Sequence, residues 1–151
     1  MFELKGVQIV PITLHIGLGS LRPVDVEDIT KYKIDSEYMS IDESATRLIN
    51  YSLEHKKRVC AIGFSVVKAT ESSVSVSKRL KPTEQWTNTF IYPPYNFKIC
   101  TSLLTNFHLP GSAPLMNAAA FGGYDLIMEA YQAAIQEKYR FFVYGDAMLI
   151  I

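Results

Sequence analysis

The sequence predicts an α/β fold, in which a mixed and partly parallel sheet is flanked by helices. Segments rich in β-branched residues alternate along the chain with segments of helical periodicity. Crossover helices are the usual connection between parallel strands, so this alternation favours at least some parallel pairing. The 151 residues, 48% of them hydrophobic, suit one domain spanning residues 1–151 with a substantial core.

The N-terminal half contains two predicted strands and a helix. Residues 7–15 are rich in β-branched residues and predict a first strand, and the glycines and proline of residues 17–23 then require a loop. Asp42 is expected to cap a helix that runs to about Lys56, because apolar residues recur there at helical spacing. Residues 58–63 (RVCAIG) follow as a buried strand.

The C-terminal half alternates polar and apolar segments. Residues 78–88 are the most polar stretch and predict an exposed, disordered loop, which leads into a short aromatic strand at residues 89–92. Helices are predicted over residues 114–122, with proline in the first turn, and over residues 124–138. Residues 140–151 then predict a strand-like RFFV, a YGD turn and an apolar end.

Charge, cysteine content and hydropathy exclude several classes of protein. Fifteen basic and fifteen acidic residues cancel, so contact with a nucleic acid would have to be local. Cys60 and Cys100 lack the spacing of a zinc site or a redox pair and are interpreted as buried free thiols. The chain has neither a signal-peptide pattern nor a run of about 18 apolar residues, so we expect a cytoplasmic protein without a membrane contact.

Residues 15–23 (HIGLGSLRP) form the first candidate site. A strand ends at His15, and Gly17 and Gly19 allow the backbone to approach a ligand closely. Arg22 offers a bidentate donor for a carboxylate or phosphate. The alternative is that the glycines only form a tight turn and His15 caps a strand edge.

Residues 103–114 (LLTNFHLPGSAP) form the second candidate site. Thr105, Asn106 and His108 are held on a stiff, non-helical backbone, and Phe107 offers an aromatic platform. His108 suits acid–base chemistry or substrate contact because histidine titrates near neutral pH. The alternative is a hydrogen-bonded structural histidine.

The third candidate site is the turn at residues 144–146. Asp146 suits hydrogen bonding to a ribose or an amine, although a carboxylate that closes a backbone turn explains the same pattern. Glu37 and Glu71 are isolated carboxylate candidates that surface or salt-bridge roles also explain. The sequence contains no dinucleotide-binding, P-loop, zinc-protease or nucleophile-elbow motif, so these residues alone predict only a ligand-binding α/β domain.

Five ordered segments resemble one known family, the S-adenosylmethionine:tRNA ribosyltransferase-isomerases of queuosine biosynthesis. HIGLGSLRPV is similar to the family's HVGLGTFRPV, and FIYPPYNFK to FIYPGYEFK. SEYMSI, LLTNFHLP and YRFFVYGDAMLI also match family segments. The resemblance extends from about Leu4 to Ile151 and implies the C-terminal part of the family's main domain, without its inserted β-barrel.

The resemblance implies a reaction, its substrates and the roles of the site residues. The ribosyl group of S-adenosylmethionine, a substrate, is transferred to the aminomethyl group of a deazaguanine in tRNA and isomerised to give epoxyqueuosine; no metal is implied. The implied proton-handling residues are His15, Glu37, His108 and Asp146. The implied binding residues are Gly17, Gly19, Arg22, Thr105, Asn106 and Tyr144, with Tyr92 and Phe107 for stacking.

The sequence departs from the family in residues and in length. GFSVVK stands where family members commonly have GTTSLR, so Lys68 replaces an arginine, and Asp35 and Pro94 replace a histidine and a glycine. The N-terminal portion of the family is also missing. The alternative is therefore a non-catalytic binding or assembly module, completed by self-association as a homo-oligomer or by a complementary N-terminal chain.

Overall fold

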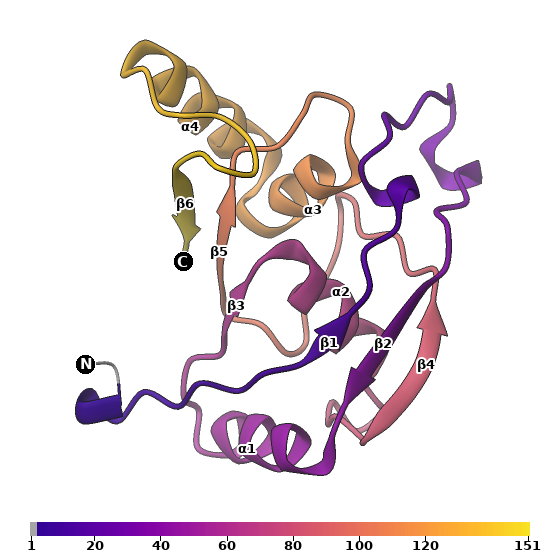
Figure 1. Ribbon diagram of the computed structural model, residues 1–151, viewed down its shortest axis with the longest axis vertical. Coiled ribbons are helices and arrows are strands. Elements are labelled where there is room, and N and C mark those ends of the chain that lie inside the picture. Colours follow the sequence, from indigo (N-terminus) through magenta and orange to yellow (C-terminus); the bar gives the residue numbers. More distant parts are fainter. Residues whose placement is uncertain (1–2) are drawn as a thin grey trace.

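The computed structural model describes residues 3–151, and its strands form two three-stranded sheets (Figure 1). The first sheet has the order β1-β2-β4 and is antiparallel throughout. In the second, ordered β3-β5-β6, β3 and β5 are parallel and β6 is antiparallel to β5. The strands are β1 (Thr13–Leu14), β2 (Glu37–Ile41), β3 (Cys60–Ile62), β4 (Thr83–Thr87), β5 (Ser102–Asn106) and β6 (Ala147–Ile150).

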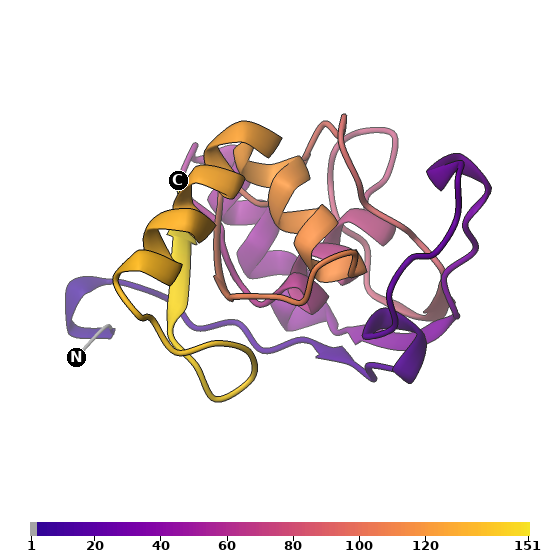
Figure 2. The same ribbon diagram turned by 90° about the horizontal axis from the view of Figure 1, so that it is seen from above.

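Helices connect and cover the strands (Figure 2), which confirms the predicted α/β class with partly parallel pairing. None of the described helices is long and apolar enough to cross a membrane. The α-helices are α1 (Glu43–Glu54), α2 (Phe64–Ser72), α3 (Ala113–Gly122) and α4 (Tyr124–Gln136). Three short 3-10 helices are η1 (Glu3–Lys5), η2 (Leu18–Ser20) and η3 (Ile29–Lys31).

The predicted Asp42 cap is present, and Ser112, which was not predicted as a cap, caps α3. The carboxylate of Asp42 accepts the N–H of Ala45 at 2.7 Å at the start of α1, and the hydroxyl of Ser112 accepts the N–H of Leu115 at the start of α3. The first helix ends at Glu54, two residues before the predicted Lys56, which adopts a φ of 51°. The basic residues after Glu54 therefore lie beyond the helix.

Helix α2 packs between the two sheets, since it contacts β1 and β2 of one and β3 and β5 of the other. The larger apolar cluster surrounds Leu103 of β5, which is fully buried, and includes Val67 of α2 and Ile127 of α4. A smaller cluster joins Met39 of β2 to Ala69 of α2. Both clusters thus include side chains of α2.

Parallel pairing of β3 and β5 determines where two helices begin. Strand β3 leads through Gly63 directly into α2, and β5 leads through residues 107–112 into α3. Because β3 and β5 are parallel, their carboxyl ends lie at one edge of the sheet, and α2 and α3 begin there. This edge is where open α/β sheets usually bind ligands.

Several sequence predictions about single elements were wrong. Residues 78–88 are not a disordered loop: they contain β4, an edge strand whose polar side chains are mostly exposed while its backbone pairs with β2. Residues 89–92 form no strand, and neither do residues 140–143, where Phe142 takes a φ of 69°. Of the predicted strand at residues 7–15, only β1 pairs with a neighbour.

The predicted burial of residues 58–63 was also wrong. Only Ala61 is buried in β3, whereas Cys60 and Ile62 are exposed because they face away from the helices. Cys60 and Cys100 are both free, as predicted, but only Cys100 is buried, which raises the pKa of its thiol to about 11. Helix α2 was not predicted from the sequence; it begins directly after Gly63, which has a φ of 93°.

Candidate functional site

The carboxylate of Glu37 on β2 is completely buried and satisfied by three groups. Its Oε1 accepts the N–H of Gly17 at 2.8 Å and the hydroxyl of Ser20 at 2.7 Å. Its Oε2 pairs with the ammonium of Lys68 on α2 at 2.7 Å, and the Lys68 side chain is only 5% exposed. Glu37 thus fixes the glycine-containing loop after β1 against α2.

Gly19 is required by close packing within the same loop. A Cβ atom at this position would lie 2.8 Å from the Cβ of Asp35, which is closer than real Cβ atoms approach other heavy atoms. Gly17 has more room, since its nearest neighbours would be atoms of Glu37 at 3.8 Å and beyond. The two glycines therefore have different roles: Gly17 supplies an N–H, and Gly19 allows a close approach.

We expect a Gly19→Ala substitution to push the loop away from Asp35 and to weaken the contacts with Glu37. The strain should destabilise the chain by about 1–3 kcal/mol, measured by urea unfolding. Gly17→Ala is the matched control and should cost less. Equal effects of the two substitutions would contradict this account of the packing.

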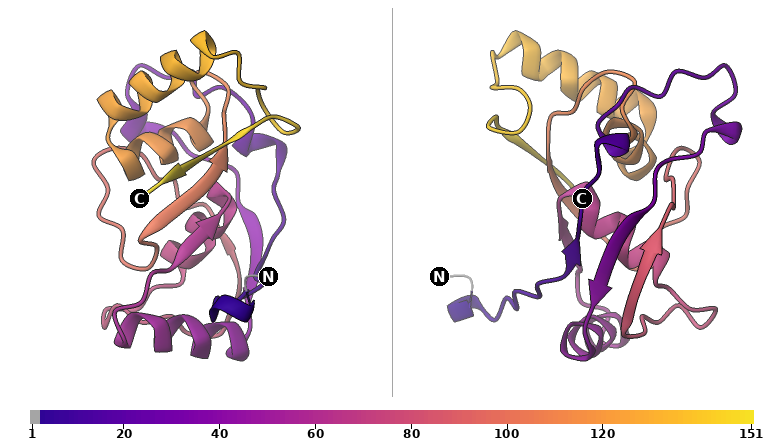
Figure 3. Two further views of the ribbon diagram at one scale, coloured as in Figure 1. Left: turned by 90° about the vertical axis from the view of Figure 1, so that its left-hand side faces the viewer. Right: turned by 45° about the vertical axis from the view of Figure 1, so that its right-hand side comes forward.

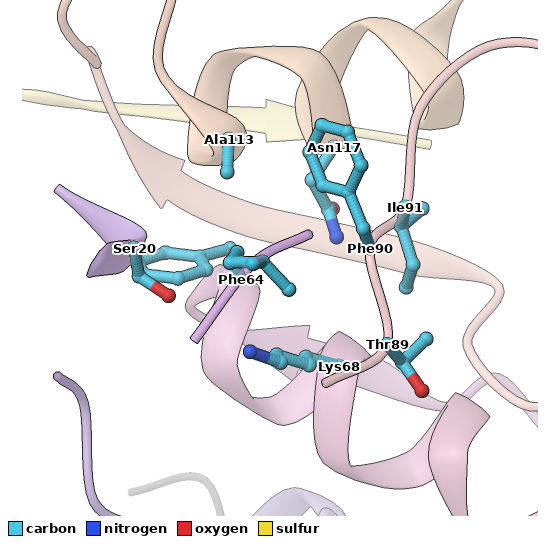
Figure 4. A pocket seen from close by; sticks show the side chains of 9 residues that line it. Ser20, Phe64, Lys68, Thr89, Phe90, Ile91, Ala113 and Asn117 are labelled. Atoms are coloured by element: carbon cyan, nitrogen blue, oxygen red, sulfur yellow. The ribbon is translucent and has the colours of Figure 1, made fainter. Parts of the chain in front are cut away.

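A small pocket lies beside the Glu37–Lys68 pair, between the starts of α2 and α3 (Figure 4). Phe64 and Lys68 approach it from α2, and Asn117 extends into it from α3. Asn117 is 4% exposed, and its side-chain oxygen has no hydrogen-bond partner. The pocket has a volume of only about 10 Å³, so as it stands it accommodates roughly one water molecule.

His108 and Thr105 form a second buried polar group, at the end of β5. The Thr105 hydroxyl and His108 Nε2 share a hydrogen bond of 2.7 Å, and the His108 backbone N–H donates to the hydroxyl of Tyr131 at 2.7 Å. Burial lowers the pKa of His108 to about 4, so the imidazole is neutral at neutral pH. The side chain therefore resembles the structural histidine that the sequence left as an alternative.

Contacts of Phe64 and of two loops connect the Glu37–Lys68 network with the His108–Thr105 pair. The ring of Phe64 lies edge-on to the ring of His108, with centroids 5.7 Å apart, and Phe64 also lines the small pocket. The Val24 N–H donates to the Gly111 carbonyl at 2.8 Å, joining the loop after β1 to the loop after β5. The first two predicted sites, at residues 15–23 and 103–114, are thus neighbours.

A larger pocket, of about 380 Å³, opens on the other side of His108, between the loop after β5 and α4. Its walls are mainly apolar and aromatic, and include Phe107, Tyr131, Tyr139 and Phe141. The ring of Phe107 lies edge-on to Tyr131 at a centroid separation of 5.1 Å. This volume and lining suit a small aromatic ligand.

The third predicted site is a turn held together by ion pairing. Arg140 donates to the Asp146 carboxylate from its guanidinium at 2.6 Å and from its backbone N–H at 2.7 Å, and these bonds lower the pKa of Asp146. Asn106 donates its side-chain N–H to the backbone carbonyl of Asp146 at 3.2 Å. Tyr144 is almost fully exposed. Asp146 and Asn106 therefore close and anchor this turn.

The remaining predicted residues lie apart from the buried groups. His15 is exposed and packs edge-on against Tyr38, which packs in turn against Trp86 of β4. Arg22 is exposed, and Tyr92 packs against Phe90, whose side chain lines the small pocket. The predicted site residues therefore divide between the Glu37 network, the His108 pair, the YGD turn and the exposed aromatic row of His15, Tyr38 and Trp86.

Sequence reasoning missed several residues that the structure places at the site. Ser20 and Asn117 were not singled out, and Lys68 and Phe64 were noted only as departures from a family pattern. A lysine within an apolar stretch, VVKAT, was the available signal for Lys68, since buried lysines need a charged partner. Among the described residues, no group of histidine, cysteine or acidic side chains is arranged to hold a metal ion.

Comparison with known proteins identifies the family. Residues 1–150 match the family model described as queuosine biosynthesis protein. The chain belongs to this family. Two curated relatives, both named S-adenosylmethionine:tRNA ribosyltransferase-isomerase, are 66% identical (Amoebophilus asiaticus) and 56% identical (Cytophaga hutchinsonii) over 149 residues, which is 99% of this chain.

A solved structure that covers nearly all of this chain has the same fold. The crystal structure of S-adenosylmethionine tRNA ribosyltransferase from Thermotoga maritima superposes with a TM-score of 0.77 at 35% identity and covers 99% of this chain. The chain spans less than half the length of its relatives: 43% of each of the two curated proteins and 47% of the crystallised chain. The matches therefore establish family and fold for a part of the longer proteins.

Proposed function

We propose that this chain supplies part of the substrate site of an S-adenosylmethionine:tRNA ribosyltransferase-isomerase. The reaction would move the ribosyl group of S-adenosylmethionine to the aminomethyl-deazaguanine of a tRNA and isomerise it to epoxyqueuosine, with loss of adenine and methionine. Family membership over residues 1–150 supports the reaction class. The proposal for the site rests on the loop after β5, which is hydrogen-bonded to the loop after β1 and lines the larger pocket.

The larger pocket is the proposed place for an aromatic base of a substrate. It is the more spacious of the two pockets described above, and its aromatic walls provide apolar contact for a planar ring. His108 and Arg140 are among its lining residues, so polar groups are available beside the apolar walls. Phe107 lines this pocket, which supports the stacking role that the family resemblance implied.

The four carboxylate and histidine candidates divide into two kinds. The oxygens of Glu37 and Asp146 are already engaged by Lys68 and Arg140, which supports positioning roles for both carboxylates. His108 is neutral and borders the larger pocket, and His15 is exposed on the first sheet. These two histidines are therefore the remaining candidates for removing the proton next to the sulfonium. His108 is the less favoured of the two in structural terms, because its Nε2 shares a hydrogen bond with Thr105 and burial lowers its pKa to about 4.

Calorimetric titration with S-adenosylmethionine tests the proposed pocket directly. Ala134 of α4 lines the pocket and its neighbour Ala133 does not, so Ala134→Phe fills the space while Ala133→Phe is a matched control. We expect saturable binding that Ala134→Phe weakens at least tenfold, about 1.4 kcal/mol or more, and that Ala133→Phe leaves unchanged. Equal binding by the two variants would exclude this pocket.

A second candidate is a non-catalytic module that needs another polypeptide for function. Two observations favour it: the small pocket beside Lys68 holds about one water, and the chain matches only 43% of its curated relatives. Absence of S-adenosylmethionine binding to a well-folded chain would support this second function. Binding that Ala134→Phe removes would support the first.

A further inference from the structure

The two faces of the second sheet have different surroundings. Strand register places Ala61, Leu103 and Ile150 side by side on one face, where all three are buried in the larger apolar cluster. Helices α2, α3 and α4 contribute Val67, Ala118 and Ile127 to that cluster, and its other buried members come from α1 and from loops. The opposite face is turned away from the helices, and Figure 3 (left) shows its strands in front. Among the described elements, no helix covers it in that view.

The uncovered face carries an apolar row across all three strands. Ile62 of β3 is in register with Leu104 of β5, and Leu104 is in register with Leu149 of β6. Ile62 is 69% exposed and Leu149 57% exposed. We call this surface the open face; its outward residues are the exposed Cys60, Ile62, Ala147 and Leu149 and the half-buried Leu104 and Asn106, and none is charged. Ser102, at the start of β5, is buried and lies outside the open face.

A solvent-facing sheet surface would have a different composition. Sheets with one face in water alternate apolar residues on the covered side with polar residues on the wet side, and sheets with parallel pairs are usually covered on both sides. The alternation here places aliphatic side chains on both sides of β3 and β6. The composition of the open face therefore resembles the core side of an interface, where charged residues are depleted.

We infer that the open face is the docking surface for the polypeptide region of the longer relatives that lies outside their match with these 151 residues. The chain matches 99% of its own length but only 43% of the Amoebophilus asiaticus relative, so more than half of that protein lies outside the match. At 66% identity we expect the matched part of that protein to form the same sheet. An exposed aliphatic sheet face, as in this chain, usually marks an interaction site. The inference rests on the proposed function only for the identity of the partner.

Coexpression with the unmatched region of the Amoebophilus asiaticus relative tests the docking surface. We expect a one-to-one complex by size-exclusion chromatography with light scattering, with association weakened at least tenfold by Ile62→Lys or Leu149→Lys. Leu126→Lys is the matched control, because Leu126 is 60% exposed on α4, away from the open face, and this variant should bind as the unchanged chain does. Circular dichroism establishes that each variant is folded.

Three outcomes would overturn the inference. One is a folded chain that does not associate with the unmatched region, and another is a complex that tolerates both lysine substitutions. The third is a homodimer of this chain that Ile62→Lys dissociates, since a second copy would then be the cover. Association is measured without S-adenosylmethionine or tRNA. The result can therefore be interpreted even if the proposed activity is not found.

Discussion

Replacing Lys68 with methionine is expected to destabilise the folded chain by about 3–5 kcal/mol, because it leaves the carboxylate of Glu37 buried without a counter-charge. The hydroxyl of Ser20 and the N–H of Gly17 would still donate to that carboxylate, but neither carries a charge. Desolvation of an unpaired charge is the dominant penalty in such a site. A loss of this size is a large fraction of the stability of an ordinary domain.

Urea unfolding of four variants separates the ion pair from simple loss of a side chain. Glu37→Gln combined with Lys68→Met removes both charges and should recover part of the loss. Lys68→Arg keeps the charge and restores the residue common in the family, so it should be tolerated better than methionine. Lys57→Met changes an exposed lysine and should alter stability by less than about 0.5 kcal/mol. A loss below about 1 kcal/mol for Lys68→Met would contradict a stabilising role for the pair.

Acidification from about pH 6.5 to pH 4 is expected to remove up to about 3 kcal/mol of stability through His108. Its pKa is about 4 in the folded chain and 6.5 when exposed, so the unfolded chain binds a proton in this window that the folded chain does not. Stability therefore falls as the pH falls through the window, at about 1.4 kcal/mol per pKa unit. Below about pH 4 both states are protonated and the contribution of His108 is already lost.

Chemical unfolding at several pH values, compared with a His108→Gln variant, measures this contribution. Glutamine retains a hydrogen-bonding group beside Thr105 but does not titrate, so its stability should vary less between pH 6.5 and pH 4. His55→Gln replaces an exposed histidine and is the control that should keep the original slope. Asp28 and Asp146 have lowered pKa values, so their contributions begin to fall only below about pH 5. Both groups are unchanged in His108→Gln, so the comparison of the two proteins isolates His108. An unchanged slope in His108→Gln would refute the assignment.

Local patterns predicted helices better than strands. The signals for α1 lie close together in the sequence: Asp42 as the cap and apolar residues at helical spacing over residues 45–53. The signals for α3 are Ser112 and Pro114. Strand β4 lacks such a signal because it is polar at an edge, and what fixes it is pairing with β2, about 45 residues earlier in the chain. The burial of β3 was also predicted wrongly because Ile62 is aliphatic and therefore suggests a core position. In the structure Ile62 lies on the open face and is exposed.

Motif strings located the loops of the candidate site but not the roles of their side chains. The sequence singled out Glu37 and Asp146 as proton-handling groups, and nothing local indicated that Lys68 and Arg140 would engage them. Residue type alone could not distinguish the role of Gly17 from that of Gly19. Only the neighbouring atoms in the structure show that Gly17 donates its N–H to Glu37 and that Gly19 packs closely against Asp35. Asn117 escaped notice because it sits in an alanine-rich helix, where an amide carries no motif.

The hydrogen bond from the Val24 N–H to the Gly111 carbonyl affects the order in which parts of the chain fold. This hydrogen bond joins residues that are 87 positions apart in sequence. The Glu37–Lys68 ion pair joins residues that are 31 positions apart. Contacts of such high sequence separation carry a large loop-closure cost and form slowly compared with local helices. When the complete chain folds, we therefore expect the candidate site to assemble after the local helices α1 and α4. During synthesis the site cannot form before the ribosome has passed Gly111.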